Sequence, residues 1–346
     1  MDLDWNLPRS ADYFLARLAT LHDRMRARLY REGASSSIDT LAEVAQARGG
    51  DTIFALDLHA EEELESFFSA WGDDLPLLLL AEGFPDDGGK TFPAGTPRAE
   101  VAFTCIVDPI DGTRGLMYQK RSAWILSGIA PAPRAALPTL TDIRVAMQTE
   151  LPTSRSLLSD CLWATVGSGA HAKTTNLETG VVQSFEPRPS RADSLLYGFG
   201  TVSKFFPGAK VPAVQVEERL FRELFGPPID GNPQVFDDEY ISTGGQLYEL
   251  MVGHDRFTAD LRPLFQAALS TAGEVPRISS HPYDLCTELI ARAAGVIVTD
   301  ERGEPLRYSL DIRTDCNWIG YANAAIKAQI EPRLMAILRE EFGLIG

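Results

Sequence analysis

Apolar residues recur at three- and four-residue spacing near the start of the chain, which predicts an amphipathic helix there. The positions are Phe14, Leu15, Leu18, Leu21, Met25 and Leu29. Ser10 precedes this pattern and is placed to cap the helix. Similar patterns predict further helices at 41–47, 61–71, 214–224, 246–252, 285–294 and 332–342.

Short apolar or β-branched runs, bounded by Pro, Gly or Asp, predict strands between these helices. The runs are 77–80, 102–107, 124–130, 143–148, 162–166, 194–199, 235–242, 296–299 and 318–322. Helices and strands alternate without a regular β–α–β repeat, which favours a layered α+β or mixed α/β fold over a barrel. The pattern breaks at 185–193, which predicts an N-terminal lobe of residues 1–190 and a C-terminal lobe of residues 191–346 in one two-lobed unit.

The composition restricts the classes of function that the chain can have. Its 346 residues include 32 Lys and Arg against 48 Asp and Glu, so the net charge is −16. Such an acidic surface does not attract nucleic-acid polymers or anionic membranes, although a metal ion could still bring a small phosphorylated substrate to it. The cysteines form no CxxC pair, and the chain shows neither a leader segment nor an apolar run of about 20 residues. We therefore expect a reduced, cytoplasmic protein that does not span a membrane.

The segment 107–113, with the sequence VDPIDGT, carries the most specific chemistry in the chain. Asp108 and Asp111 can converge on one side of a tight turn, because Pro109 fixes φ and removes a competing N–H donor. Gly112 permits a close approach of the backbone. Two carboxylates beside backbone N–H groups suit a divalent metal ion and a phosphate. The segment alone also fits a simple strand-ending turn, because D-P and D-G are common turn dipeptides.

The motif DPIDGT after an apolar strand resembles the signature of the inositol monophosphatase superfamily of metal-dependent phosphomonoesterases. The segment 281–306, HPYDLCTELIARAAGVIVTDERGEPL, is similar to the second signature of that family. Weaker similarities lie at 51–57, at 77–82 and at 242–260, and all of them follow the order of the family. The resemblance implies a layered αβαβα sandwich of the inositol monophosphatase or sugar phosphatase type, with the site between two lobes.

The resemblance also implies a magnesium site. One ion would be held by Glu82, Asp108 and the carbonyl group of Ile110, and a second by Asp108, Asp111 and Asp284. Two ions at about 3.5–4 Å can activate a water and stabilise the leaving oxygen. Gly83 stands where the family has a second Glu, which leaves open whether two or three ions bind.

Further roles follow from the same resemblance. The hydroxyl of Thr113 and the carboxylate of Asp57 would form the relay that takes the proton of the water, and Glu82 is counted with them as catalytic. The residues that would contact the substrate are Gly112, Thr113, Arg114, Gly244 and Gly245. Without the family pattern, Asp57 and Glu82 fit solvated surface acids, and Asp284 fits a helix N-cap.

We expect a Mg²⁺-dependent phosphatase that hydrolyses an inositol, cyclitol or sugar monophosphate with a metal-activated water. One alternative is a nucleotide 3′-phosphatase or sugar bisphosphatase of the same superfamily. Another is a catalytically silent relative that binds anions or regulates a partner. Arg114 stands where inositol phosphatases often have Thr, and with Lys120 and Arg121 it either contacts a second anionic group of the substrate or is solvated. The resemblance further implies inhibition by lithium and leaves a homodimer open.

Overall fold

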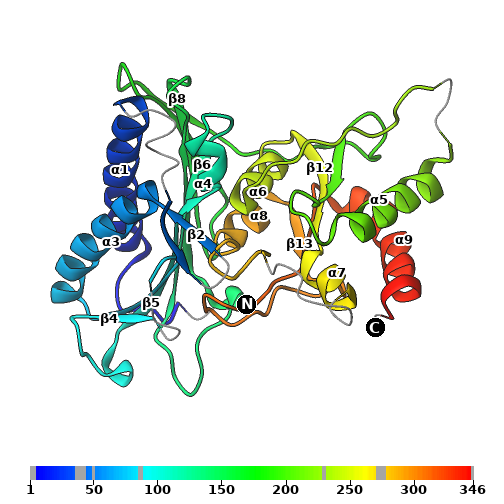
Figure 1. Cartoon of the computed structure of the whole chain (residues 1–346). Helices are drawn as coiled ribbons and strands as arrows, with labels where there is room; N and C mark the ends of the chain where they lie inside the picture. The colour runs from blue at the N-terminus through cyan, green and yellow to red at the C-terminus, as the bar shows by residue number, and fades with distance from the viewer. Residues whose placement is uncertain are drawn as a thin grey trace.

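The computed structural model describes residues 5–35, 44–48, 51–84, 89–227, 231–269 and 278–343, with side chains outside 32–59. Five layers follow one another across the molecule, in the order helices, sheet, helices, sheet, helices (Figure 1). The αβαβα sandwich predicted from the sequence is thereby confirmed. The first helix layer consists of α1 (Ala11–Ser35) and α3 (Ala55–Asp74). The middle layer consists of α6 (Thr243–Met251) and α8 (Glu288–Ala294). The last layer consists of α5 (Lys210–Phe225), α7 (Arg262–Leu269) and α9 (Ala324–Phe342).

The large sheet has eight strands. Adjacent strands in it are antiparallel, except that β3 and β5 are parallel. In spatial order its strands are β10 (Val182–Phe185), β9 (His171–Asn176), β8 (Leu158–Thr165), β7 (Val145–Leu151), β6 (Ala123–Pro131), β5 (Phe103–Asp111), β3 (Leu77–Ala81) and β4 (Lys90–Phe92). A short helix, α4 (Thr113–Met117), follows β5 directly. The end of β5 and the start of α4 therefore contain the whole DPIDGT motif.

The small sheet has four strands and also mixes directions. Its order is β11 (Phe199–Val202), β12 (Asp255–Asp260), β14 (Trp318–Tyr321) and β13 (Ile297–Thr299). β11 and β12 are parallel, whereas β14 is antiparallel to both of its neighbours. A separate hairpin of β1 (Val44–Arg48) and β2 (Asp51–Phe54) precedes α3.

The first helix buries the face that its spacing predicts. Phe14, Leu18 and Leu21 are fully buried on α1, which packs against β7. Trp71 of α3 lies beside them and contacts Phe103 of β5 with ring centroids 5.2 Å apart. These side chains form one hydrophobic core between the outer helices and the large sheet, and burying each of them contributes roughly 1.5–3 kcal/mol.

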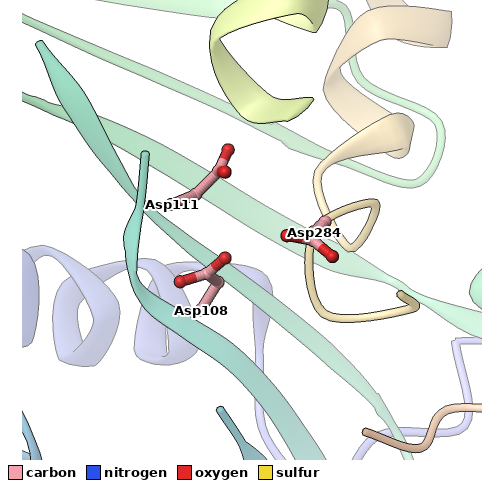
Figure 2. Close-up of side chains that lie close together, drawn as sticks. All are labelled: Asp108, Asp111 and Asp284. Carbon is pink, nitrogen blue, oxygen red and sulfur yellow. The ribbon is translucent and has the colours of Figure 1, made fainter. Parts of the chain in front are cut away.

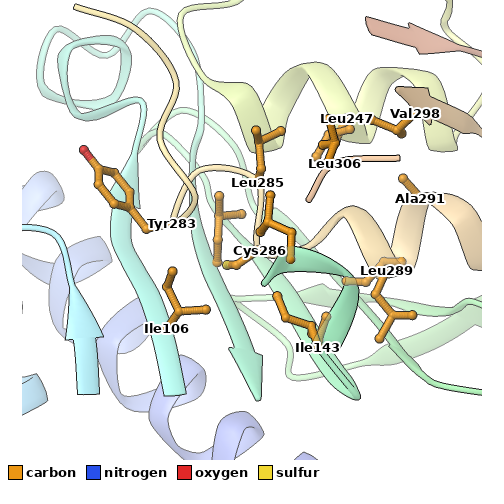
Figure 3. Packing of buried hydrophobic residues seen from close by; sticks show 14 of the residues in the cluster. Ile106, Ile143, Leu247, Tyr283, Leu285, Cys286, Leu289, Ala291, Val298 and Leu306 are labelled. Atoms are coloured by element: carbon orange, nitrogen blue, oxygen red, sulfur yellow. The ribbon is translucent and has the colours of Figure 1, made fainter. Parts of the chain in front are cut away.

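A second core fills the space between the two sheets (Figure 3). Leu285 and Cys286, which follow Asp284, point into this core and pack with Ile106 of β5 and Ile143. Leu247 of α6 and Val298 of the small sheet belong to the same core. The loop that carries Asp284 is thus held against the large sheet by its own apolar side chains.

Three local predictions are wrong. The predicted helix 41–47 contains β1 from Val44 on, while 41–43 lie outside the described residues, so pairing with β2 overrides the helical propensity of its alanines. The predicted strand 235–242 makes only one bridge, at Phe236, and Ser242 caps α6 instead. The predicted strand 194–199 begins only at Phe199, its last residue.

The strands β9 and β10 are not predicted because their polar sequences lack an apolar stripe and form an exposed edge of the sheet. β10 ends at Phe185 and β11 begins at Phe199, so the large sheet is completed before the small one begins. The division into lobes at 190 and 191 stays a prediction. No helix in the described ranges is both long and apolar enough to cross a membrane.

Gly128 of β6 is a position at which the fold tolerates no side chain. A Cβ atom there would lie 2.8 Å from Cδ1 of Ile143 and 3.1 Å from the carbonyl oxygen of Cys286. We predict that Gly128→Ala lowers the free energy of unfolding by about 1–3 kcal/mol, because the Asp284–Cys286 loop must move away from the sheet. Urea denaturation measures this change.

Gly169→Ala is the matched control, because no atom lies within 4 Å of the Cβ that it adds. If both variants unfold at the same urea concentration as the parent protein, the loop is not held at Gly128.

Candidate metal centre

A β-bulge brings Asp108 and Asp111 to the same side of β5. Asp108 pairs with Leu126 of β6, and Asp111 pairs with Trp124. The chain therefore advances by three residues on β5 while it advances by only two on β6. In a regular strand, residues three apart point to opposite faces, and the extra residue of a bulge reverses this. Pro109 lies inside the bulge. A proline is tolerated there because a bulged residue does not need to donate a hydrogen bond to the neighbouring strand. The two carboxylates therefore converge through a bulge within a continuing strand, and the predicted tight turn after Val107 is wrong.

Asp284 reaches the same place from the loop before α8. Its Oδ2 accepts a hydrogen bond from the backbone N–H of His281 at 2.6 Å, and its own N–H donates to the carbonyl of His281 at 3.1 Å. The imidazole of His281 stacks on the ring of Tyr283 and lies 3.7 Å from the Asp284 carboxylate. This one-turn structure fixes the direction of the Asp284 side chain toward β5 (Figure 2).

The carboxylates of Asp108, Asp111 and Asp284 form one cluster (Figure 2), in which one oxygen of each lies within 4.8 Å of the others. Asp108 and Asp111 are buried, and Asp284 is partly exposed. In the parts of the chain that the structure describes, no Lys or Arg forms an ion pair with Asp108 or Asp111. The two buried carboxylates thus lie side by side without a pairing Lys or Arg in the described chain, and only Asp284 has a basic neighbour, the imidazole of His281.

The pKa values of the two buried acids reflect this arrangement. Burial, followed by repulsion from Glu82, Asp111 and Asp284, raises the pKa of Asp108 well above its usual range. Burial and the charge of Asp284 raise the pKa of Asp111 to about 8, although hydrogen bonds from α6 act in the opposite direction. Both acids are consequently stabilised in the charged form only when a cation is close.

The amino end of α6 holds the carboxylate of Asp111. Oδ2 accepts hydrogen bonds from the Ser242 hydroxyl at 2.8 Å and from the Gly244 N–H at 2.5 Å. Oδ1 accepts a longer bond from the Thr243 N–H at 3.3 Å. The first-turn N–H groups of a helix have no partner within the helix, and they carry partial positive charge. Asp111 satisfies them and is fixed in orientation as a result.

A glutamine from the large sheet aligns the two middle helices around this contact. Gln148 of β7 donates to the carbonyl of Gly244 at 2.7 Å and accepts from the hydroxyl of Thr287, just before α8, at 3.0 Å. Gln148 and Thr287 are completely buried. The helix that orients Asp111 and the helix that follows Asp284 are therefore tied to one side chain.

The remaining predicted residues lie at different places around the cluster. Glu82 follows β3 and is close enough for its charge to act on Asp108. The carbonyl of Ile110 accepts a hydrogen bond from the Thr113 hydroxyl at 2.8 Å. Arg114 lies with its guanidinium carbon 5.8 Å from the ring centroid of Phe206. Asp57 is in the first turn of α3, but its side chain lies outside the described residues.

The three glycines of the prediction have defined roles in packing. Gly112 has φ 95° before α4, and a Cβ there would lie 3.0 Å from the Cβ of Ser242. A Cβ at Gly244 would lie 2.9 Å from Oδ2 of Asp111. The N–H of Gly245 donates to the Ser242 hydroxyl at 2.8 Å. Small residues at these points allow α6 to approach the bulge, and their contact with a substrate stays a prediction.

Sequence reasoning misses Ser242, Thr243 and Gln148, which hold the candidate ligands in place. The pattern S-T-G-G before an apolar helix is a capping signal, but the preceding strand-like run obscures it. Gln148 is a polar residue inside the apolar run VAMQTEL, which indicates a buried hydrogen-bonded side chain. Its two partners become visible only in the fold.

The cluster fits a hard divalent cation. Its donors are carboxylate oxygens, with a backbone carbonyl beside them, and Mg²⁺ prefers oxygen ligands. Such an ion would neutralise the charge of Asp108 and Asp111, which pair with no Lys or Arg among the described residues. Zinc, by contrast, is usually bound by Cys or His, and the described Cys286 is fully buried with a pKa raised by burial and then by Asp108.

The comparison with known proteins supports the fold. No protein-family model matches the chain, and no curated protein matches it. Among solved structures, a fructose-1,6-bisphosphatase from Leishmania major superposes with a TM-score of 0.66 at 14% identity, covering 96% of each chain. The extragenic suppressor protein suhB from Bartonella henselae gives 0.60 at 15% identity, covering 93% of this chain and 98% of its own. An IMPase from Thermotoga maritima gives 0.59 at 16% identity, with 94% and 98% covered.

The chain therefore has the fold of the inositol monophosphatase and fructose-1,6-bisphosphatase superfamily. The resemblance stated from the sequence motifs is confirmed at this level. The identities are too low to carry an activity from these proteins to this chain.

The raised pKa of Asp111 predicts how stability varies with pH in metal-free protein. An acid whose pKa rises from 3.8 to about 8 on folding binds its proton more tightly in the folded state. The free energy of unfolding should therefore decrease as the pH rises from about 4 to about 8. Urea denaturation in the presence of a chelator, at a series of pH values, measures this slope.

Asp111→Asn should flatten that slope, and so should saturating Mg²⁺, which neutralises the cluster. A slope that is the same in the parent protein, the variant and the magnesium-loaded protein would show that Asp111 does not carry the buried charge.

Proposed function

We propose that this protein is a Mg²⁺-dependent phosphatase that releases phosphate from a small phosphorylated metabolite. The observation that carries the proposal is the cluster of Asp108, Asp111 and Asp284, in which Asp108 and Asp111 are buried without a pairing cation in the described chain. It is supported by a fold shared with a fructose-1,6-bisphosphatase and an IMPase. A regulatory relative without activity would have no need to keep three acids in this unfavourable arrangement.

Five groups would hold the ions, namely Glu82, Asp108, the Ile110 carbonyl, Asp111 and Asp284. When bound, Mg²⁺ supplies an activated water and stabilises negative charge on the oxygens of the phosphate and the leaving group. Ser242 and Gly244 fix the Asp111 oxygens, and His281 fixes Asp284, so the ligands are oriented before an ion arrives.

We assign to Thr113 the role of orienting a water. Its hydroxyl proton is used in the bond to the Ile110 carbonyl, so its oxygen can accept a hydrogen bond from a water near the cluster. We assign the next step, transfer of the proton from the Thr113 hydroxyl to the carboxylate of Asp57, to the relay that the sequence predicts.

The three basic residues after the motif differ in what they can offer a substrate. Arg121 is held by Asp238 at 3.0 Å and Glu249 at 3.4 Å, and it covers the ring of Tyr240. Arg114 is the second residue of α4, which follows the bulge, and its guanidinium group lies beside the ring of Phe206. Because Arg114 directly follows Thr113 of the motif, we assign a second anionic group of the substrate to Arg114, within the class of inositol, cyclitol and sugar phosphates. Lithium inhibition, a homodimer and the cytoplasmic location stay predictions from the sequence.

The experiment that tests this function is a screen of phosphorylated metabolites for released phosphate, with Mg²⁺ and with a chelator. We expect turnover of at least one sugar, cyclitol or nucleotide phosphate that depends on Mg²⁺. Absence of turnover throughout the screen, in protein that binds Mg²⁺, would favour the silent anion-binding alternative.

Asp108→Asn removes a carboxylate from the middle of the cluster and should lower turnover by orders of magnitude. The fold should survive, because the substitution also removes repulsion from the buried acids. Phosphate release measures the first effect and thermal denaturation the second. Asp12→Asn, at an exposed position of α1, is the control. Near-normal turnover of Asp108→Asn would exclude the cluster as the catalytic centre.

Thr113→Ala removes the hydroxyl that orients the water and should lower kcat by about 10²- to 10⁴-fold. The Mg²⁺ concentration for half-maximal activity should hardly change, because the carboxylates remain. Thr113→Ser retains the hydroxyl and should restore much of the rate. Equal rates for the alanine and serine variants would mean that the hydroxyl has no part in the reaction.

A further inference from the structure

A cavity whose lining contains none of the candidate metal ligands lies at the start of β6. Its volume is about 290 Å³, and it is lined by the turn after α4, the ends of β6 and β7, and the outer turns of α6. Sites for small molecules typically measure about 300–1,000 Å³, so this cavity suits a ligand of roughly amino-acid size. Glu249 of its wall is about 7.5 Å along α6 from Gly244, at 1.5 Å rise per residue.

The floor of the cavity is aromatic. The rings of Trp124 and Tyr248 pack at a centroid distance of 4.6 Å, and Tyr240 lies beside them. Their polar atoms already have partners within the protein. Trp124 Nε1–H donates to the Tyr240 hydroxyl at 2.9 Å, Tyr240 donates to the Ser122 carbonyl at 2.8 Å, and Tyr248 donates to Asp160 at 2.7 Å. Trp124 and Tyr240 are buried and Arg121 covers the ring of Tyr240, so the partly exposed ring of Tyr248 is the ring surface that the floor offers. The charged groups of the rim must provide the polar contacts.

One acid of the rim has hydrogen bonds but no cation. Glu150 accepts from the Ser122 hydroxyl at 2.6 Å and from the Asp160 N–H at 3.1 Å. Across the described ranges, no basic side chain forms an ion pair with it. The side chain is only partly exposed, and burial raises its pKa. A positively charged group entering the cavity would meet this carboxylate.

One base of the rim has no anion. Within the described chain, the ammonium group of Lys120 makes neither a hydrogen bond nor an ion pair, although its backbone N–H donates to Gly115. Arg121, the neighbouring cation, is already held by Asp238 and Glu249. Lys120 is therefore the cation of this rim that can receive an anionic group from a ligand.

We propose that this cavity binds a small zwitterion, a molecule of the amino-acid class that carries an ammonium and a carboxylate group. Its ammonium pairs with Glu150 over the aromatic floor, and its carboxylate pairs with Lys120. A ligand with a single charge pairs with either Glu150 or Lys120 and leaves the other without an ion-pair partner. The site is additional to the proposed phosphatase function and does not depend on it.

Tyr240, in the floor of the cavity, connects the cavity to the candidate metal centre. A Cβ at Gly245 would lie 2.5 Å from ring atoms of Tyr240, so the ring packs tightly on the first turn of α6. The carbonyl of Tyr240 accepts the N–H of Ser242 at 2.8 Å, and Ser242 holds Asp111. A ligand that contacts Tyr240 therefore touches the segment 240–242, which positions Asp111.

The test is calorimetric titration of the intact protein with three molecules of similar length, namely 4-aminobutyrate, butyrate and butylamine. Glycine and 6-aminohexanoate vary the separation of the two charges. We expect saturable binding, with a Kd in the millimolar range or tighter, for at least one of the three zwitterions, and clearly weaker binding of butyrate and butylamine. Equal binding of butyrate, equal binding of butylamine, or no saturable binding by any zwitterion would overturn the proposal.

Two variants locate the site. Lys120→Met and Glu150→Gln should each weaken binding of the best zwitterion about tenfold or more, through the loss of one charge-assisted contact. Lys120 is exposed, so its substitution leaves the fold unaffected, and thermal denaturation verifies this for both variants. Lys210→Met, at the start of α5, is the control and should bind as the parent protein does. Unchanged binding in a folded Lys120→Met variant would place the zwitterion elsewhere.

Discussion

The hydrogen bonds between Asp111 and the amino end of α6 connect the two halves of the candidate site. Asp111 belongs to the large sheet, and α6 lies in the middle layer against both sheets. The bulge in β5, the glycines of α6 and the side chain of Gln148 all contribute to this one contact. Because the carboxylate satisfies N–H groups that would otherwise lack partners, neither element can shift without exposing a buried polar group.

The same contact leaves an electrostatic imbalance that gives the site its chemistry. The N–H groups of α6 stabilise one carboxylate, but Asp108 and Asp284 add charge that the helix cannot offset. Asp260, a buried acid in the same fold, has a cation of its own in Arg262. In the described chain Asp108 and Asp111 have no such partner, and ionisable groups with strongly shifted pKa values are often found at functional sites.

The layered architecture could be predicted from the sequence because the motifs occur in the family's order and the longest helical pattern, at 14–29, matches α1. Asp108, Asp111 and Asp284 were identifiable for the same reason, although they are 176 residues apart at their extremes (284 − 108). The bulge was not predictable, because D-P-I-D fits a turn equally well until β6 supplies its register. Gln148 and Ser242 were missed because their importance lies in partners that are distant along the chain.

The proposed function depends on the carboxylates of Asp108, Asp111 and Asp284 forming a divalent metal centre. A crystal grown or soaked with Mn²⁺, measured at the manganese absorption edge, tests this most directly, because anomalous scattering locates the ion without reference to activity. We expect at least one anomalous peak among these three side chains, within coordination distance of their oxygens. Manganese bound only at other acidic positions, with the cluster left closed by protonated acids or by a basic side chain, would contradict it.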